Sequence, residues 1–295
     1  MTAQPNRALR VFLAGIGFTV LWPSAATATK IALANSQPLV ISVFRFFIGG
    51  LIMLGVSHGI MRQRLPSGKE WKQLAIYGLL NISLYLGIYI IAMQYVSAGL
   101  GSLAIATNPV FISIISGVVL KKRIGNPVLV SLVICLTGVF IAAWPLFAGA
   151  QATPGGIVLL LLSMLIYSLG VIYFSETVWN KLDILTINGW QTLLGGLFLL
   201  PFACIAYDAE LNGYTTEFWM SVLWLATAVS IAAVQLWLYL LRDNPVKASF
   251  WLFFCPLAGF LIAWVMVGEP ITGFTIAGMV LVIAGLYLVQ RRKTA

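Results

Sequence analysis

Charged side chains are scarce in this sequence. Asp, Glu, Lys and Arg make up 8% of its 295 residues, whereas an average soluble domain carries about 25%. Hydrophobic residues make up 61%, and apolar runs of about twenty residues, each long enough to cross a bilayer, recur from end to end. The composition excludes an ordinary soluble protein and predicts an all-α polytopic membrane protein without a sizeable soluble domain.

Histidine and cysteine are also rare. The chain has one histidine, His58, and three cysteines, Cys135, Cys204 and Cys255, each cysteine inside an apolar run. This pattern indicates neither a metal site nor a disulfide framework. Since the apolar spans also lack a carboxylate pair, a phosphate-binding loop and a nucleophile–base pair, we expect no enzymatic activity and no cofactor.

Acidic residues number only 8 against 17 basic ones, which gives a net charge of +9. The basic residues are dispersed among short loops and form no stripe with interleaved aromatics, so we expect no nucleic-acid partner. The excess positive charge is better explained by membrane topology.

Ten transmembrane spans are predicted. They cover residues 10–33, 38–57, 72–93, 98–120, 125–145, 155–175, 184–205, 217–241, 246–267 and 270–290. The first span resembles a signal peptide in having basic residues before it, but it is long for that role and its cleavage would break a regular set. We therefore expect an uncleaved first helix.

The basic residues predict the orientation. With the amino terminus inside, 15 of the 17 Lys and Arg residues lie in cytoplasmic segments and the outer loops hold none. Four acidic residues, Asp208, Glu210, Glu217 and Glu269, fall on the outer side. The positive-inside rule then predicts that both termini are cytoplasmic.

The carboxyl-terminal helix pair repeats an earlier one at an offset of 147 residues. Ser102 aligns with Ser249, Pro109 with Pro256 and Gly138 with Gly285. An offset of 145 likewise pairs Trp22 with Tyr167 and Gly50 with Gly195. Because each half holds five spans, an odd number, residues 1–150 and 151–295 are expected to form two inverted five-helix repeats.

Several local patterns together resemble a known family. They are Trp22-Pro23-Ser24 in the first span, Phe44-Arg45-Phe46 in the second, Ala106-Thr107-Asn108-Pro109 in the fourth and Gly268-Glu269-Pro270 after the ninth. In order and spacing they resemble the EamA-type members of the drug/metabolite transporter superfamily, over almost the whole chain.

The resemblance implies ten helices around a central cavity, with helices 1–4 and 6–9 lining it and helices 5 and 10 supporting them. It also implies a bacterial inner-membrane exporter of small organic metabolites, often amino acids, aromatic ones included, or their derivatives, working by alternating access. The expected partners are a small-molecule substrate and the lipid bilayer. The substrate itself does not carry over, and the oligomeric state, a monomer included, stays open.

Arg45 is the candidate for substrate binding with the clearest chemistry. A guanidinium in an apolar span should face the interior or water. There it would either clamp a substrate carboxylate with its planar fork or fix the second helix through a structural ion pair or a contact with helix-end carbonyls. Helix 3 adds a stripe at four-residue spacing, Tyr77, Asn81, Tyr85 and Tyr89, which is expected either to form a cavity wall or to hold the bundle together.

Further cavity candidates are aromatic or amide residues of the other spans: Trp22, Tyr167, Trp190, Gln191, Gln235 and Trp251. Pro23, Pro109 and Pro256 are candidate hinges, because proline frees a backbone carbonyl and bends a helix. Glu269 is expected to cap the start of the tenth helix.

Two other functions remain open. A multidrug exporter of cationic amphiphiles would prefer an acidic cavity, whereas the charges inside these spans are basic. A non-transporting membrane protein would tolerate mutation of the helix 3 stripe. Because no Asp or Glu lies in the middle of a span, we expect facilitated diffusion, exchange, or coupling through a less obvious group than a carboxylate.

Overall fold

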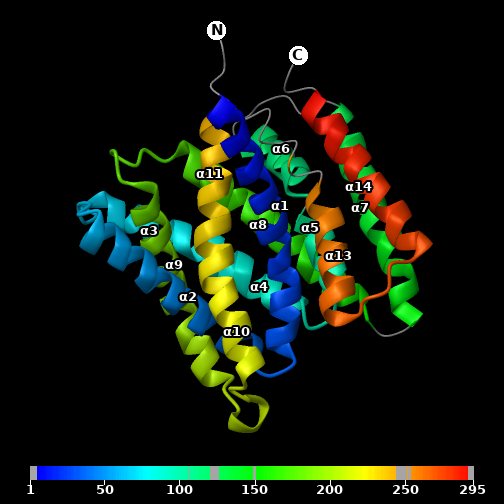
Figure 1. Cartoon of the computed structure of the whole chain (residues 1–295), viewed down its shortest axis with the longest axis horizontal. Helices are drawn as coiled ribbons and strands as arrows, with labels where there is room; N and C mark the ends of the chain where they lie inside the picture. Colours follow the sequence, from blue (N-terminus) through cyan, green and yellow to red (C-terminus); the bar gives the residue numbers. More distant parts are fainter. Residues whose placement is uncertain are drawn as a thin grey trace.

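The computed structural model describes residues 5–105, 107–119, 126–148, 151–243, 251 and 254–291. All regular structure in these ranges is helical, and the helices pack side by side in one bundle (Figure 1). Several residues used in the sequence analysis lie outside the described ranges: Ala106, Lys121, Lys122, Arg123, Lys247, Ser249, Arg292 and Lys293.

The helices of the first half are α1 (Pro5–Leu33), α2 (Pro38–Leu54), η1 (Gly55–Ile60), α3 (Lys69–Gly78), η2 (Leu79–Leu84), α4 (Tyr85–Ala92), α5 (Ala98–Ile105), α6 (Asn108–Val119) and α7 (Asn126–Ala148). Those of the second half are α8 (Pro154–Glu176), α9 (Ile184–Ile205), η3 (Ala209–Leu211), α10 (Thr216–Trp224), η4 (Leu225–Ala233), α11 (Val234–Asp243), α13 (Cys255–Val267) and α14 (Gly273–Arg291). The segments η1, η2 and η4 are π-helical, and η3 is a 3₁₀ turn.

The described chain is an all-helical membrane protein by length and composition. Seven helices are long and apolar enough to cross a membrane, and α5 with α6 forms an eighth span if that bent pair is counted as one. Two shorter apolar helices, Cys255–Val267 and Gly273–Leu288, complete the set. Each of the ten spans predicted from the sequence therefore has a helical counterpart, although the ninth is described as a helix only from Cys255.

Helix starts are marked by capping side chains. Thr153, Asp183 and Thr215 each accept a hydrogen bond from a backbone N–H in the first turn of the helix that follows, at 2.9–3.2 Å. These bonds satisfy donors that have no partner within the helix. At the other end of α13, Gly268 adopts a left-handed conformation with φ 69°, which glycine reaches without steric cost.

Small residues bring two pairs of helices into close contact. A Cβ built on Gly195 of α9 would lie 2.7 Å from the carbonyl oxygen of Gly78, and one on Gly138 of α7 would lie 2.8 Å from that of Gly278 in α14. Side chains larger than hydrogen are excluded there, as is usual where membrane helices approach closely.

The three predicted hinge prolines lie in different contexts. The fourth predicted span bends by 44° between α5 and α6, and Pro109 is the second residue of α6. Pro256 lies in the first turn of α13, and Pro23 lies inside α1, which continues past it as one helix. Pro109 therefore stands directly beside the bend that its sequence position predicts.

Candidate functional site

A cavity of about 350 Å³ lies inside the bundle. Its described lining comes from α1, α2, α5, α6, α8 and α9 and from the two helical stacks α3–η2–α4 and α10–η4–α11, and none of it from α7, α13 or α14. The volume falls within the range of about 300–1,000 Å³ typical of small-molecule sites. Most lining groups are aromatic or aliphatic, and a few are polar.

Eight of the eleven predicted cavity residues line this space: Trp22, Arg45, Tyr77, Asn81, Tyr85, Tyr89, Tyr167 and Gln191. They come from α1, α2, the α3–η2–α4 stack, α8 and α9, so the fold brings together residues up to 169 positions apart (Trp22 to Gln191). All four stripe residues of the third predicted span line the cavity. The structure divides that span into α3, η2 and α4.

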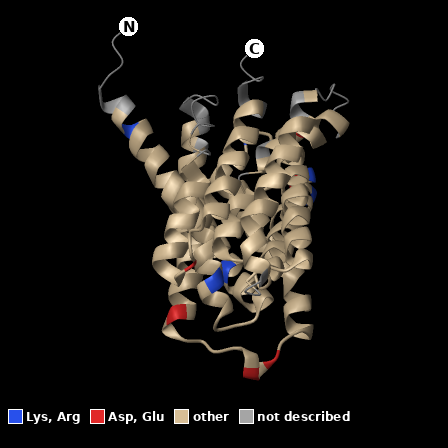
Figure 2. Cartoon of the chain, turned by 90° about the vertical axis from the view of Figure 1, so that its right-hand side faces the viewer, with Lys and Arg blue, Asp and Glu red and all other residues tan. Residues whose placement is uncertain are grey.

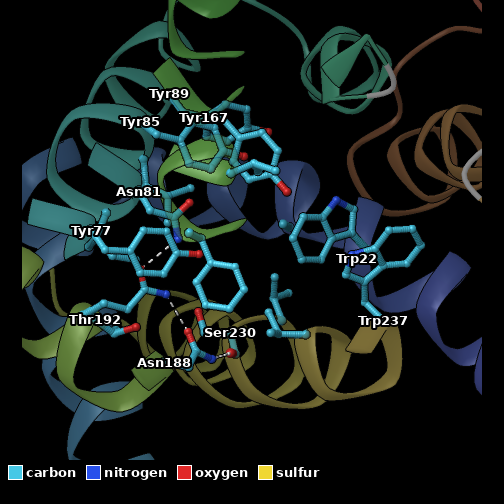
Figure 3. Close-up of a pocket in the computed structure, with 18 of the residues that line it drawn as sticks. Trp22, Tyr77, Asn81, Tyr85, Tyr89, Tyr167, Asn188, Thr192, Ser230 and Trp237 are labelled. Atoms are coloured by element: carbon cyan, nitrogen blue, oxygen red, sulfur yellow. Dashed lines mark hydrogen bonds between the residues drawn. The ribbon is translucent and has the colours of Figure 1, made fainter. Parts of the chain in front are cut away.

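One wall of the cavity is aromatic. The ring of Tyr85 lies 4.8 Å from that of Tyr167 and 6.2 Å from that of Tyr89, centroid to centroid. Figure 3 shows these three tyrosines grouped together, with Trp22 and Trp237 on another side of the space. Such a wall can stack against an apolar or aromatic body of a ligand.

A chain of amides forms a second, polar wall (Figure 3). Asn81 Nδ2 donates to Gln191 Oε1 at 3.1 Å, and Gln191 Nε2 donates to Asn188 Oδ1 at 2.8 Å. Asn188 Nδ2 in turn contacts the backbone oxygen of Ser230 at 3.2 Å. This series of hydrogen bonds links the α3–η2–α4 stack, α9 and η4, and it fixes the orientation of each amide group.

Arg45 lies at the end of this polar wall. Its side chain is 7% exposed, its Nε donates to Ser230 Oγ at 3.2 Å, and its guanidinium carbon lies 5.4 Å from the centroid of the Phe46 ring. Within the described ranges Arg45 forms no ion pair with a carboxylate. The structural ion pair considered from the sequence is thus absent from that part of the chain.

The two segments that place Asn81 and Ser230 on the cavity are π-helical. Asn81 lies in η2 and Ser230 in η4. A π-helical turn contains more residues than an α-helical turn, which changes the direction of the side chains around it, and such turns are frequent at functional sites. Local backbone geometry therefore positions part of the polar wall.

Three predicted residues lie elsewhere. Trp190 donates from Nε1 to His58 Nε2 at 3.0 Å and packs edge-on against Trp71. Trp251 lies against Phe12 and covers Gly15 of α1. Gln235 is outside the lining as well, and its Nε2 is buried without a hydrogen-bond partner among the described residues.

Fifteen of the 23 described lining residues were not predicted from the sequence, and they include the polar residues Asn188, Thr192 and Ser230 and the tryptophan Trp237. A signal for the first two was present, because Asn188, Gln191 and Thr192 follow the i, i+3, i+4 spacing of one helix face. Trp190 and Gln191 were both predicted, yet neighbouring residues point about 100° apart on a helix, so only Gln191 faces the cavity.

Hydrogen bonds outside the cavity link distant segments at the bundle end that holds Asp208 and Glu210. Glu269 accepts from the backbone N–H groups of Ala98 and Gly99 at 2.5 and 2.8 Å, and Lys30 Nζ donates to the Met93 oxygen at 2.8 Å. The predicted capping of the tenth helix by Glu269 is wrong. The carboxylate bonds the start of α5, because the loop before α14 carries it there.

Another contact joins two loops at the opposite end of the bundle. Arg64 forms a two-pronged ion pair with Glu70 at 2.6–2.7 Å and also donates to the Asn180 oxygen at 2.9 Å. The hydrogen bonds with Glu70 raise the pKa of Arg64. This contact ties the α2–α3 connection to the α8–α9 connection.

Comparison with known proteins identifies the class of protein that contains this cavity. Residues 9–144 and 154–291 each match the EamA-like transporter family. The chain belongs to that family. It is therefore a multi-pass membrane transporter and not an enzyme, and the two matching segments indicate that it contains a repeat.

Individual relatives extend over nearly the whole chain. "Uncharacterized transporter YoaV" of Bacillus subtilis is 27% identical over 283 residues, which cover 95% of this chain and 96% of the relative. "Protein PecM" of Dickeya dadantii is 24% identical, over 92% and 89%. A solved crystal structure shares the fold, with a TM-score of 0.65 at 17% identity, covering 97% of this chain and 99% of its own.

Proposed function

We propose that this transporter exports small organic metabolites across a bacterial inner membrane by alternating access, with amino acids, aromatic ones included, and their derivatives as its cargo. The observation that carries the proposal is the cavity itself. It combines an aromatic wall, an amide wall and one buried guanidinium, Arg45, without a carboxylate partner among the described residues.

Helix packing supports the arrangement as two inverted five-helix repeats. Under the repeat, α1 corresponds to α8, and the α5–α6 span corresponds to α13. The observed packing of α1 on α13 is therefore equivalent to the observed packing of α8 on α6. At the offset of 147, Gly138 corresponds to Gly285 and Ser131 to Gly278. A Cβ on Gly138 would meet the Gly278 oxygen, and a Cβ on Gly285 would meet the Ser131 oxygen. This reciprocal contact is expected of a pseudo-two-fold axis between α7 and α14.

The π-helical segments of the cavity wall support the same relation. η2 spans Leu79–Leu84 and η4 spans Leu225–Ala233, so their starts are 146 residues apart. Each interrupts the third helix of its half and each contributes lining residues. Trp22 and Tyr167, paired at the offset of 145, also both line the cavity.

Charge distribution supports cytoplasmic termini. The start of α1 and the end of α14 lie at one end of the bundle (Figure 1), and acidic residues gather at the opposite end (Figure 2). Arg10 and Arg291 belong to the two helices that begin and end at the termini end, and the positive-inside rule then orients that end toward the cytoplasm.

Alternating access requires helices that bend. The bend between α5 and α6 lies beside Pro109, and Pro256, its equivalent at the offset of 147, lies in the first turn of α13. α6 packs on α8, and α13 packs on α1. Both prolines begin a new helix, so rotation there breaks no backbone hydrogen bond of a continuous helix. We propose Pro109 and Pro256 as hinges, with Pro23 adjusting the position of Trp22.

The test is counterflow in proteoliposomes with labelled amino acids, their N-acyl derivatives and one cationic dye. Wild-type protein is compared with Arg45→Ala and with Lys72→Ala, which removes an exposed charge outside the cavity. Exchange of metabolites that Arg45→Ala reduces at least tenfold and Lys72→Ala leaves unchanged is the expected result. Flux of the dye alone would favour the multidrug alternative, and no flux of any compound would remove the transport proposal.

A further inference from the structure

The described lining of the cavity carries positive charge and no negative charge. Arg45 is the only charged side chain among its described lining residues, and the lining contains no Asp or Glu. A buried charge without a partner costs several kcal/mol relative to water. The free energy of the empty site is therefore lowered when an anion enters it.

The hydrogen-bonding capacity of Arg45 is largely unused. A guanidinium has five N–H donors in a planar fork, and within the described part of the chain only Nε has a partner, Ser230 Oγ. Its terminal N–H groups remain available for two parallel bonds to a carboxylate, the geometry in which arginine binds most strongly.

Tyr89 provides a second donor without a partner. Its side chain is 3% exposed, it lines the cavity, and its hydroxyl makes no hydrogen bond within the described residues. Tyr89 and Arg45 both line this cavity. An anion at Arg45 gives the Tyr89 hydroxyl an acceptor once this side chain turns away from Gly101 of α5, against which its oxygen packs.

Groups of the polar wall that could bind an ammonium are neutral, and each already accepts one hydrogen bond. The oxygens of Gln191 and Asn188 accept from neighbouring amides, and the backbone oxygen of Ser230 accepts from Asn188. An ammonium carries three donors and is best stabilised by a carboxylate. The described polar wall therefore suits the anionic end of an amino acid and leaves its cationic end poorly bound.

We infer that the preferred cargo is a monoanion that carries no cationic group: a carboxylate joined to an apolar or aromatic body, such as an N-acylated amino acid. The carboxylate binds Arg45 and Tyr89, the acyl amide lies along the amide wall, and the body packs on Tyr85 and Tyr167. This inference rests on the proposed transport function and narrows its cargo from amino acids in general to their anionic derivatives.

The test uses four ligands that place a different charge on the same phenylalanine body: the zwitterion phenylalanine, the anion N-acetylphenylalanine, the cation phenylalanine methyl ester and the neutral N-acetylphenylalanine amide, which is the isosteric control for the anion. Binding to the purified full-length protein is measured by calorimetry, and counterflow is measured in proteoliposomes. N-acetylphenylalanine is expected to bind about tenfold or more tightly than the other three, the scale of one hydrogen-bonded charge.

Variants of the protein test whether the preference for N-acetylphenylalanine depends on Arg45. Arg45→Gln is expected to abolish it, Arg45→Lys to retain part of it because a point charge replaces the fork, and Lys72→Ala to leave it unchanged. If Arg45→Gln does not fold, Tyr89→Phe provides the second measurement, with a severalfold loss for N-acetylphenylalanine and no change for the amide.

The outcomes separate this inference from the function on which it rests. Phenylalanine bound as tightly as its N-acetyl derivative, a preference that persists in the folded Arg45→Gln variant, or a preference that Tyr89→Phe leaves undiminished would overturn the inference and leave a carrier. Flux of the cationic ester alone would also overturn it. No flux of any of the four compounds or of other metabolites would instead overturn the transport function.

Discussion

At the scale of single residues, the cavity side chains differ in how completely they are satisfied. Asn81, Gln191 and Asn188 hydrogen-bond one another, so they are held in fixed orientations. Arg45 has one bond and Tyr89 has none among the described residues. Groups with unused donors store an unfavourable free energy that a ligand can remove, whereas satisfied groups mainly preserve the shape of the site.

The substitution Tyr89→Phe separates these two roles. It removes a buried hydroxyl without a partner, so the thermal stability of the ligand-free protein is expected to stay the same or rise slightly. Thermal unfolding in detergent measures this. The matched control is Tyr95→Phe, at an exposed tyrosine outside the cavity. A clear fall in melting temperature for Tyr89→Phe alone would mean that its hydroxyl has a structural partner.

The four-residue stripe of the third predicted span lies along the cavity in the structure. Tyr77, Asn81, Tyr85 and Tyr89 all line the cavity, as their four-residue spacing indicated. In α9 and α11 the choice of single polar or aromatic residues was less reliable, because residue type does not say which way a helix is rotated. Asn188 and Trp237 were missed and Trp190 and Gln235 lie elsewhere for this reason.

At the scale of helices, glycine decides how closely α7 and α14 approach. Gly138 and Gly285 each contact the backbone of the opposite helix, at positions related by the repeat. Neither helix lines the cavity in the described residues, which agrees with a supporting role for this pair. Their contact stabilises the fold rather than the site.

Gly138→Val tests that contact. The added Cβ would lie 2.8 Å from the Gly278 oxygen, so the helices must separate and the protein is expected to lose about 1–3 kcal/mol of stability. Gly285→Val should have a similar effect. Gly155→Val is the control, because a Cβ at Gly155 meets nothing within 4 Å. Equal melting temperatures for Gly138→Val and Gly155→Val would contradict the close approach.

Helix interruptions were predicted only in part. Proline marked the bend beside Pro109 because its missing N–H is visible in the sequence. The π-helical segments η2 and η4 carry no comparable signal: Leu79–Leu84 and Leu225–Ala233 contain no proline or glycine. Such segments depend on how the whole bundle packs, so sequence reasoning treated both helices as regular.

At the scale of the whole molecule, hydrogen bonds link distant segments at the end with Glu269. Glu269 joins the α13–α14 loop to α5, and Lys30 joins α1 to the end of α4. Under alternating access these contacts must break when the cavity opens to that side, so their strength sets how often it opens.

Glu269→Gln is expected to open this end more often. The neutral amide loses the charge-assisted part of two hydrogen bonds to backbone N–H groups, worth about 1.5 kcal/mol, or roughly tenfold in an opening equilibrium. Opening is measured as the rate at which a membrane-impermeant maleimide labels Val96→Cys, a fully buried position in the α4–α5 connection, with the exposed Cys204 replaced by Ser.

Glu210→Gln is the control for charge at the same end, since Glu210 is exposed and its side chain makes no described hydrogen bond. Labelling from the outside that accelerates in Glu269→Gln and not in Glu210→Gln supports both the closure and the proposed orientation. An unchanged rate would show that Glu269 does not hold this end closed.

The amino-acid sequence alone predicted a helical bundle in a membrane, the approximate positions of its helices and the relation between its halves. Hydrophobic length, the spacing of prolines and glycines and the pattern at an offset of 147 are local properties of the chain, so they are readable without coordinates. Only the tertiary structure decided which candidates share one cavity, that Arg45 bonds Ser230, and that Glu269 reaches α5. Those contacts join residues 170 or more positions apart, and they depend on helix rotation and packing, which residue type alone does not specify.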